Sequence, residues 1–126
     1  MPPIEGLSIQ GRNRILRIDR IDSHTVRVRV HHPVSGEGRT ADVPLQQLRD
    51  AIDSICSGLD IRLNSLDGSM MAEFSASQLA KRHDRPGWSS VWVRPHKLDG
   101  SQRGGNGWFI NVQNPALQTL INQMAI

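Results

Sequence analysis

The residues best suited to binding chemistry are arginines, and they cluster in two segments of the chain. Thirteen of the fifteen basic residues are arginine, whose planar guanidinium can hold a phosphate or carboxylate through two hydrogen bonds and can stack on rings. Residues 12–32 and 81–103 each carry a formal charge of +4, and residues 33–80 between them carry −4. The modest net charge of +3 therefore conceals two basic segments.

Aromatic residues are also unevenly placed, since four of the five lie within or just after the second basic segment. Basic residues interleaved with aromatic ones are typical of nucleic-acid-binding surfaces, where rings stack on bases and cations contact phosphates. The alternative interpretation is that the tryptophans fill the core and the arginines are merely solvated. The candidate binding residues come from the outer face of a first hairpin and from the second segment: Arg17, Arg27, Arg29, His31, Arg82, Arg85, Trp88, Trp92, Arg94, His96, Lys97, Arg103 and Trp108.

Side chains that could hold a metal or catalyse a reaction follow no known pattern. The five histidines lack the spacing of a zinc site, and the adjacent His31 and His32 would point to opposite faces of a strand. Cys56 is the single cysteine, which excludes an intrachain disulfide, and we interpret it as a small core residue. We therefore expect no metal, cofactor or catalytic residue, although a hydrolase built from His31, His96 and distant carboxylates stays open.

Length and composition indicate one globular domain over residues 1–126, with a loosely ordered N-terminal segment at 1–11. No apolar run is long enough to cross a bilayer, and the first residues lack the pattern of a secretion signal. We therefore expect a cytoplasmic protein with no membrane contact.

The first basic segment has the alternation of a β-hairpin. Three valines alternate with polar residues over 25–32, which is the period of a half-buried strand, and residues 14–21 can pair with it across a loop at 22–24. This register places Arg17 opposite Arg29 on the outer face. Such a like-charge contact is unfavourable, and an anion between the two arginines would relieve it.

The remaining patterns predict two further hairpins, with a helix after each of the three. The fold class is therefore α+β, an antiparallel sheet in the order ββα-ββα-ββα. The C-terminal helix has no charged side chain, so we expect it to pack on the sheet or on a second subunit as a homodimer. The expected elements are a strand over 39–43 and a helix over 44–57; a hairpin over 59–74 that turns at Asp67-Gly68 and pairs Arg62 with Glu73, then a helix over 75–83; and strands over 88–95 and 108–113, then a helix from Asn114.

Together these features favour a nonenzymatic nucleic-acid-binding domain whose partner is DNA or RNA. The alternative is a module that binds an acidic small molecule or a protein, with tryptophans lining a pocket or interface and arginines anchoring carboxylates. A helix-turn-helix over 77–97 is disfavoured by Pro95 and by the alternation before it. The deciding question is whether the two basic segments share one face, which the sequence leaves open.

Overall fold

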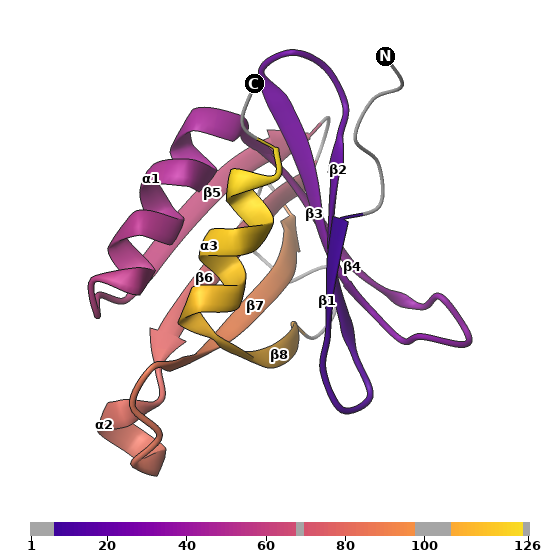
Figure 1. Cartoon of the computed structure of the whole chain (residues 1–126). Coiled ribbons are helices and arrows are strands. Elements are labelled where there is room, and N and C mark those ends of the chain that lie inside the picture. Colours follow the sequence, from indigo (N-terminus) through magenta and orange to yellow (C-terminus); the bar gives the residue numbers. More distant parts are fainter. Residues whose placement is uncertain (1–6, 68–69, 98–106, 125–126) are drawn as a thin grey trace.

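The computed structural model describes residues 7–67, 70–97 and 107–124. Within them, eight strands form two antiparallel four-stranded sheets, each in chain order (Figure 1). The first sheet contains β1 (Leu7–Gln10), β2 (Ile15–Arg20), β3 (Thr25–His31) and β4 (Gly38–Pro44). The second contains β5 (Ile61–Asp67), β6 (Met70–Gln78), β7 (Trp88–Lys97) and β8 (Trp108–Gln113).

Helices follow each sheet. The first sheet is followed by α1 (Leu45–Cys56) and the second by α3 (Asn114–Asn122), while α2 (Ala80–His83) is a short insertion between β6 and β7. The α+β class and the antiparallel pairing are confirmed. The expected ββα-ββα-ββα order is wrong, because four strands precede each of the two longer helices.

Strand β1 accounts for part of this difference. Residues 7–10 were expected within a loosely ordered segment at 1–11, but they pair with β2, with Leu7 opposite Ile18. Leu7 and Ile9 pack against the hydrophobic core, and β1 also contacts α3. Apolar side chains at alternate positions therefore fix even this short edge strand to the sheet.

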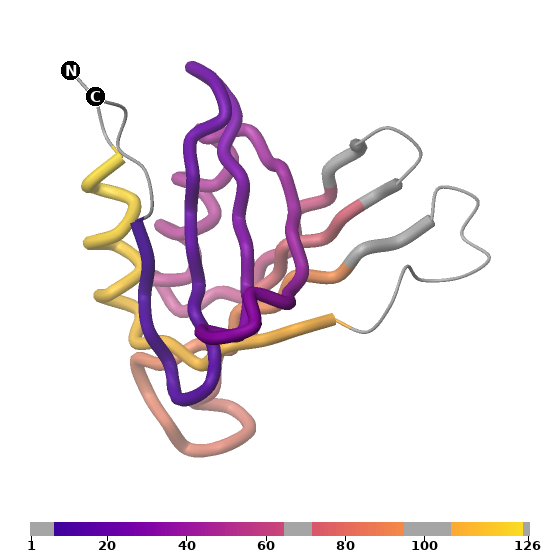
Figure 2. The backbone as a smooth tube through the Cα atoms, turned by 90° about the vertical axis from the view of Figure 1, so that its right-hand side faces the viewer, coloured from indigo at the N-terminus to yellow at the C-terminus, as the bar shows by residue number. Residues whose placement is uncertain are grey.

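The core lies between the two sheets, whose strands cross rather than run alongside each other (Figure 2). Valines 26, 28 and 30 of β3 are fully buried, as are valines 91 and 93 of β7. Helices α1 and α3 contact each other and add their apolar stripes to the same core. Because each sheet buries one face against the other, the two outer faces point away from each other.

The pairing of β2 with β3 is the predicted one, since Arg17 lies opposite Arg29 and Asp19 opposite Arg27. The predicted register of β5 and β6 is wrong by two residues: Arg62 lies opposite Ser75 rather than Glu73. A shift of two residues leaves every side chain on its predicted face, so the alternation of the sequence does not oppose it. The tip of this hairpin, 68–69, lies outside the described residues.

The helix expected over 75–83 is mostly strand. Strand β6 continues to Gln78, and only the four residues of α2 are helical. The Gln78 side chain, expected to cap a helix, instead donates hydrogen bonds of 3.0 Å to the carbonyl oxygens of Ile55 and Leu59. The helix-turn-helix alternative is also wrong, because its second helix coincides with β7.

A buried polar cluster joins the ends of several elements. Ser89 Oγ donates to Asn114 Oδ1 at 2.6 Å, and Asn114 Nδ2 donates to Gln78 Oε1 at 3.2 Å and to the Ile55 carbonyl oxygen at 3.4 Å. Ser89, Gln78 and Asn114 are all buried. The cluster ties the end of α1 to β6, β7 and the start of α3.

Cys56 lies at the end of α1, and the interpretation as a core residue is wrong because this cysteine is exposed. Its Sγ donates to the Asn114 carbonyl oxygen at 3.3 Å. Desolvation of the sulfur raises the pKa of the thiol, and the nearby Asp53 carboxylate raises this pKa further. Both effects favour the neutral thiol, which is the unreactive form.

Candidate nucleic-acid interface

The strand residues of the two basic segments do not share a face. Strand alternation places Arg17, Arg27 and Arg29 on the outer face of the first sheet, whereas Trp92 and Arg94 lie on the outer face of the second. We call these the first-sheet face and the second-sheet face. Each must therefore be judged separately as a binding surface.

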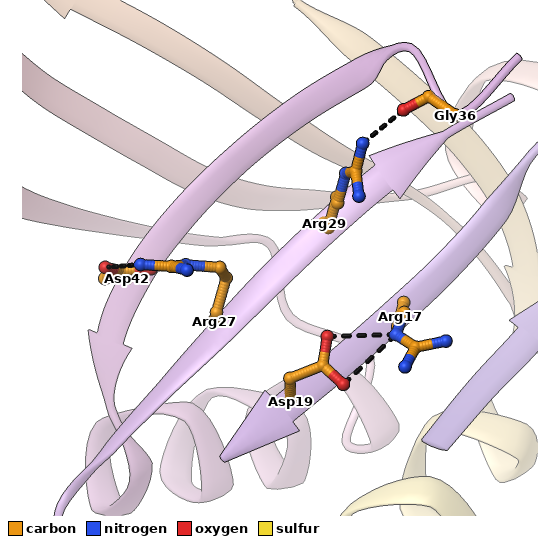
Figure 3. A network of polar contacts seen from close by, with 6 residues as sticks. All are labelled: Arg17, Asp19, Arg27, Arg29, Gly36 and Asp42. Atoms are coloured by element: carbon orange, nitrogen blue, oxygen red, sulfur yellow. Dashed lines mark hydrogen bonds and ion pairs between the residues drawn. The ribbon is translucent and has the colours of Figure 1, made fainter. Parts of the chain in front are cut away.

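The first-sheet face carries arginines that are paired within the protein (Figure 3). Arg17 Nε donates to both carboxylate oxygens of Asp19, at 3.0 and 3.1 Å. Arg27 donates two hydrogen bonds to Asp42, from Nε at 2.8 Å and from Nη2 at 3.0 Å. Asp42 comes from β4, so this ion pair spans two strands and leaves little charge for a ligand.

The remaining members of this face are also engaged. Arg29 Nη2 donates to the carbonyl oxygen of Gly36, in the loop between β3 and β4 (Figure 3). His31 Nδ1 makes a 3.0 Å hydrogen bond to the His32 carbonyl oxygen. The like-charge contact between Arg17 and Arg29 is therefore relieved by partners inside the chain, so it no longer argues for a bound anion.

The second-sheet face combines arginine with aromatic rings, of which Phe109 is exposed and Trp92 is half-buried. One row across the sheet places Arg62, Ser75, Trp92 and Phe109 side by side on its four strands. The Trp92 and Phe109 rings stack, with centroids 4.6 Å apart, and Phe109 is 44% exposed. The Arg94 guanidinium lies 4.5 Å from the centroid of the Trp92 ring. A base could therefore find both a ring and a cation here.

The charge around this aromatic row favours an anion. Asp60, Glu73 and Arg82 help to line a cleft of about 530 Å³ that also includes Trp92 and Arg94. Glu73 is nearly buried and pairs with Arg62 Nε at 3.2 Å, while Asp60 accepts a backbone N–H from the end of β6 at 2.8 Å. Arg82 and Arg94 make no ion pair with any described residue. The cleft therefore holds three arginines against two acids, and Arg82 and Arg94 have no carboxylate partner among the described residues.

Arginines cover the other two tryptophans as well. The Arg85 guanidinium lies 4.1 Å from the Trp88 ring centroid, and those of Arg14 and Arg39 lie 4.2 and 5.4 Å from the Trp108 ring centroid. Cation–π contacts at exposed sites contribute about 0.5–1 kcal/mol each. Every tryptophan of the chain therefore holds at least one guanidinium in place.

Strand alternation decides where the other predicted residues lie. Trp88 and Trp92 share the second-sheet face, but Trp108 faces inward beside the core. Phe109, absent from the predicted site, takes the outer position on β8, and the alternation of 108–113 was the signal for it. The side chains of His96 and Lys97, two predicted site residues at the end of β7, are not described, and Arg103 lies outside the described residues.

The described part of the chain contains neither a membrane-spanning helix nor a cluster of metal ligands. No helix there is long and apolar enough to span a membrane. No group of three or more histidine, cysteine, aspartate or glutamate side chains there is placed to hold a metal ion.

The fold is similar to that of solved structures. It matches the plant transcriptional regulator PBF-2 with a TM-score of 0.68 and 10% identity over 98% of this chain and 80% of that one. MRP1/MRP2 from Trypanosoma brucei match with a TM-score of 0.53 and 11% identity over 90% of this chain and 74% of that one. A guide-RNA-binding protein complex bound to a guide RNA matches with a TM-score of 0.51 and 10% identity over 98% and 83%.

Sequence comparisons give no match, since no protein-family model and no curated protein matches the chain. At identities of 10–11% the structural likeness shows the fold alone. The binding surface of this chain must therefore be argued from its own residues.

Proposed function

We propose that this chain binds nucleic acid, DNA or RNA, as a single strand on its second-sheet face. The stack of the half-buried Trp92 on the exposed Phe109 carries the proposal, because aromatic rings at a surface offer unpaired bases a partner for stacking. Bases within a duplex already stack on one another, so such rings favour single strands. Support also comes from the similar fold of a protein bound to a guide RNA.

Arginines beside the stack would contact the phosphates. Arg82 and Arg94 have no carboxylate partner among the described residues, whereas Arg17 and Arg27 of the first-sheet face pair with aspartates. A guanidinium that must first leave an aspartate gains little from a phosphate. The proposed interface is therefore the second-sheet face, and the first-sheet face is not part of it.

Truncation of the stack tests this function. We expect Trp92→Ala to weaken binding of a labelled single-stranded oligonucleotide about 5- to 150-fold, since one base stack is worth about 1–3 kcal/mol. Trp92→Phe keeps a ring and should retain most of the affinity. Fluorescence anisotropy at low salt, with DNA and RNA strands and a duplex, provides the measurement.

Arg27→Ala on the first-sheet face is the matched control and should bind like the parent chain. No binding of any strand at tens of micromolar protein would contradict the proposed function. Equal affinity for a duplex would contradict the preference for single strands, and equal binding by Trp92→Ala would contradict the role of the stack.

A further inference from the structure

A second cleft, of about 730 Å³, lies between the β1–β2 turn and β8, the last strand of the second sheet. Its volume falls within the range of roughly 300–1,000 Å³ that is usual for small-molecule sites. No acidic residue lines it among the described residues. The side chains that matter for binding are Arg12, Arg14, Arg85, Trp88, Phe109 and Asn111.

The wall formed by the turn depends on a glycine. The Gly11 N–H donates to the Arg14 carbonyl oxygen at 2.9 Å, which closes the turn. A Cβ atom at Gly11 would lie 2.7 Å from two side-chain carbons of Ile110 on β8, closer than such atoms approach. The turn therefore sits directly against β8 because residue 11 has no side chain.

Three guanidiniums give the cleft its charge. Arg85 is held over the Trp88 ring, and Arg14 is held over the Trp108 ring. Arg12 is exposed at the turn and makes no ion pair with a described residue. With three cations and no carboxylate, the cleft attracts an anion.

The amide of Asn111 gives the cleft a place for a hydrogen-bond donor. Its Oδ1 atom is buried and has no hydrogen-bond partner among the described residues. Buried polar atoms are normally paired, so an unpaired one at a cleft wall requires an explanation. Because no hydrogen bond to a described residue holds this oxygen, turning the amide toward a ligand would break none of its hydrogen bonds. Phe109 lies two residues away on the same face of β8 and lines the same cleft.

We propose that this cleft binds one nucleotide, with its phosphate at Arg12 and Arg85 and its base beside Phe109. Every base carries an N–H group that the Asn111 oxygen can accept. The nucleotide could be free, or it could belong to a strand that continues from the second-sheet face, because Phe109 stacks on Trp92 and also lines the cleft. The second source rests on the proposed function, and the first does not.

Titration of the full chain with adenosine 5′-monophosphate, adenosine and inorganic phosphate, followed by calorimetry, tests the site. We expect the monophosphate to bind at least about tenfold more tightly than adenosine, because a charge-assisted contact is lost without the phosphate. Arg12→Ala, at an exposed turn position, and Asn111→Leu should each weaken binding about tenfold. Arg17→Ala is the matched control and should have no effect.

The two sources are distinguished by repeating the titrations with a single-stranded oligonucleotide. If Arg12→Ala weakens binding of the oligonucleotide at least fivefold and the free monophosphate does not bind, the strand supplies the nucleotide. If the free monophosphate binds but the parent chain binds no oligonucleotide, the nucleotide site stands and the proposed function fails. Three results would show that the proposed site is wrong. The first is that Arg12→Ala and Asn111→Leu bind the monophosphate and the oligonucleotide as tightly as the parent chain does. The others are that adenosine binds as tightly as its monophosphate, or that the parent chain binds neither the monophosphate nor the oligonucleotide.

Discussion

The salt dependence of strand binding counts the arginines that contact phosphates. Each contact releases counterions, so on single strands the logarithm of the association constant falls with the logarithm of salt concentration by about 0.7 per phosphate. Arg82, Arg85 and Arg94 lie at or beside the second-sheet face and make no ion pair with a described residue. Three contacts predict a slope of about −2.

This slope gives definite changes in affinity. Raising the salt from about 50 to about 200 mM should weaken binding by the parent chain about 20-fold. Arg94→Gln keeps a polar side chain without the charge, so the slope for this variant should be about −1.4. The same change in salt should therefore weaken strand binding by this variant about sevenfold. Arg27→Gln removes a charge that Asp42 already neutralises, so its slope should stay near −2.

Anisotropy titrations with one labelled oligonucleotide at several salt concentrations give these slopes directly. An unchanged slope for Arg94→Gln would refute the assignment of Arg94 to a phosphate. A reduced slope for Arg27→Gln would show that the strand also crosses the first-sheet face. A slope near zero in the parent chain would favour the module that binds an acidic small molecule or a protein.

Three further predictions concern stability and reactivity. Asn114→Ala leaves the buried Ser89 and Gln78 without this partner, so it should lower the free energy of unfolding, measured in urea, by about 2–4 kcal/mol. The exposed Asn122→Ala is the control and should lower it by less than about 0.5 kcal/mol. Equal losses in the two variants would exclude a special role for the buried cluster. A hydrogen bond from the His24 backbone N–H lowers the pKa of Asp22, so the Asp22 carboxylate stabilises the fold above the ordinary carboxyl pKa, and this stabilisation is lost as pH falls through the lowered pKa. In Asp22→Asn the free energy of unfolding in urea should therefore depend less on pH on the acid side. A pH profile identical to that of the parent chain would contradict this. Cys56 should react with iodoacetamide more slowly than a free cysteine peptide by mass spectrometry, because its pKa is raised, and equally fast labelling would contradict a raised pKa.

Local features of the sequence predict the pairing of neighbouring strands only where a single register satisfies them. The β2–β3 register is correct because the loop is short and the valines must face the apolar residues of β2. In β5 and β6 a shift of two residues leaves all faces unchanged, and the Arg62–Glu73 ion pair forms diagonally instead of directly across. Charge complementarity between these two residues therefore could not distinguish the two registers.

The wrong helix over 75–83 has a different cause. Ser75 and Gln78 have the spacing of a capping box, but that motif stabilises a helix only when the side chains bond to nearby backbone groups. Gln78 bonds instead to the distant carbonyl oxygens of Ile55 and Leu59, and Ser75 lies in the row of the second-sheet face. Tertiary contacts with the end of α1 thus decide the local structure, and no local pattern reveals them.

The contact between Arg17 and Arg29 shows that two like charges facing each other on a hairpin are not by themselves evidence for a ligand. The two arginines do lie opposite each other as predicted, and on two strands alone they would repel. Arg17 pairs with Asp19 on the same strand. The partners of the other two arginines come later in the chain: Arg29 bonds to the loop before β4, and Arg27 pairs with an aspartate of β4 itself. A charge pattern on a hairpin therefore argues for a ligand only after the next strand is placed. On the second-sheet face all four strands are placed, Glu73 pairs with Arg62, and Arg82 and Arg94 make no ion pair with a described residue. The arginines proposed for binding are thus chosen because they lack a carboxylate partner among the described residues, rather than by their density along the sequence.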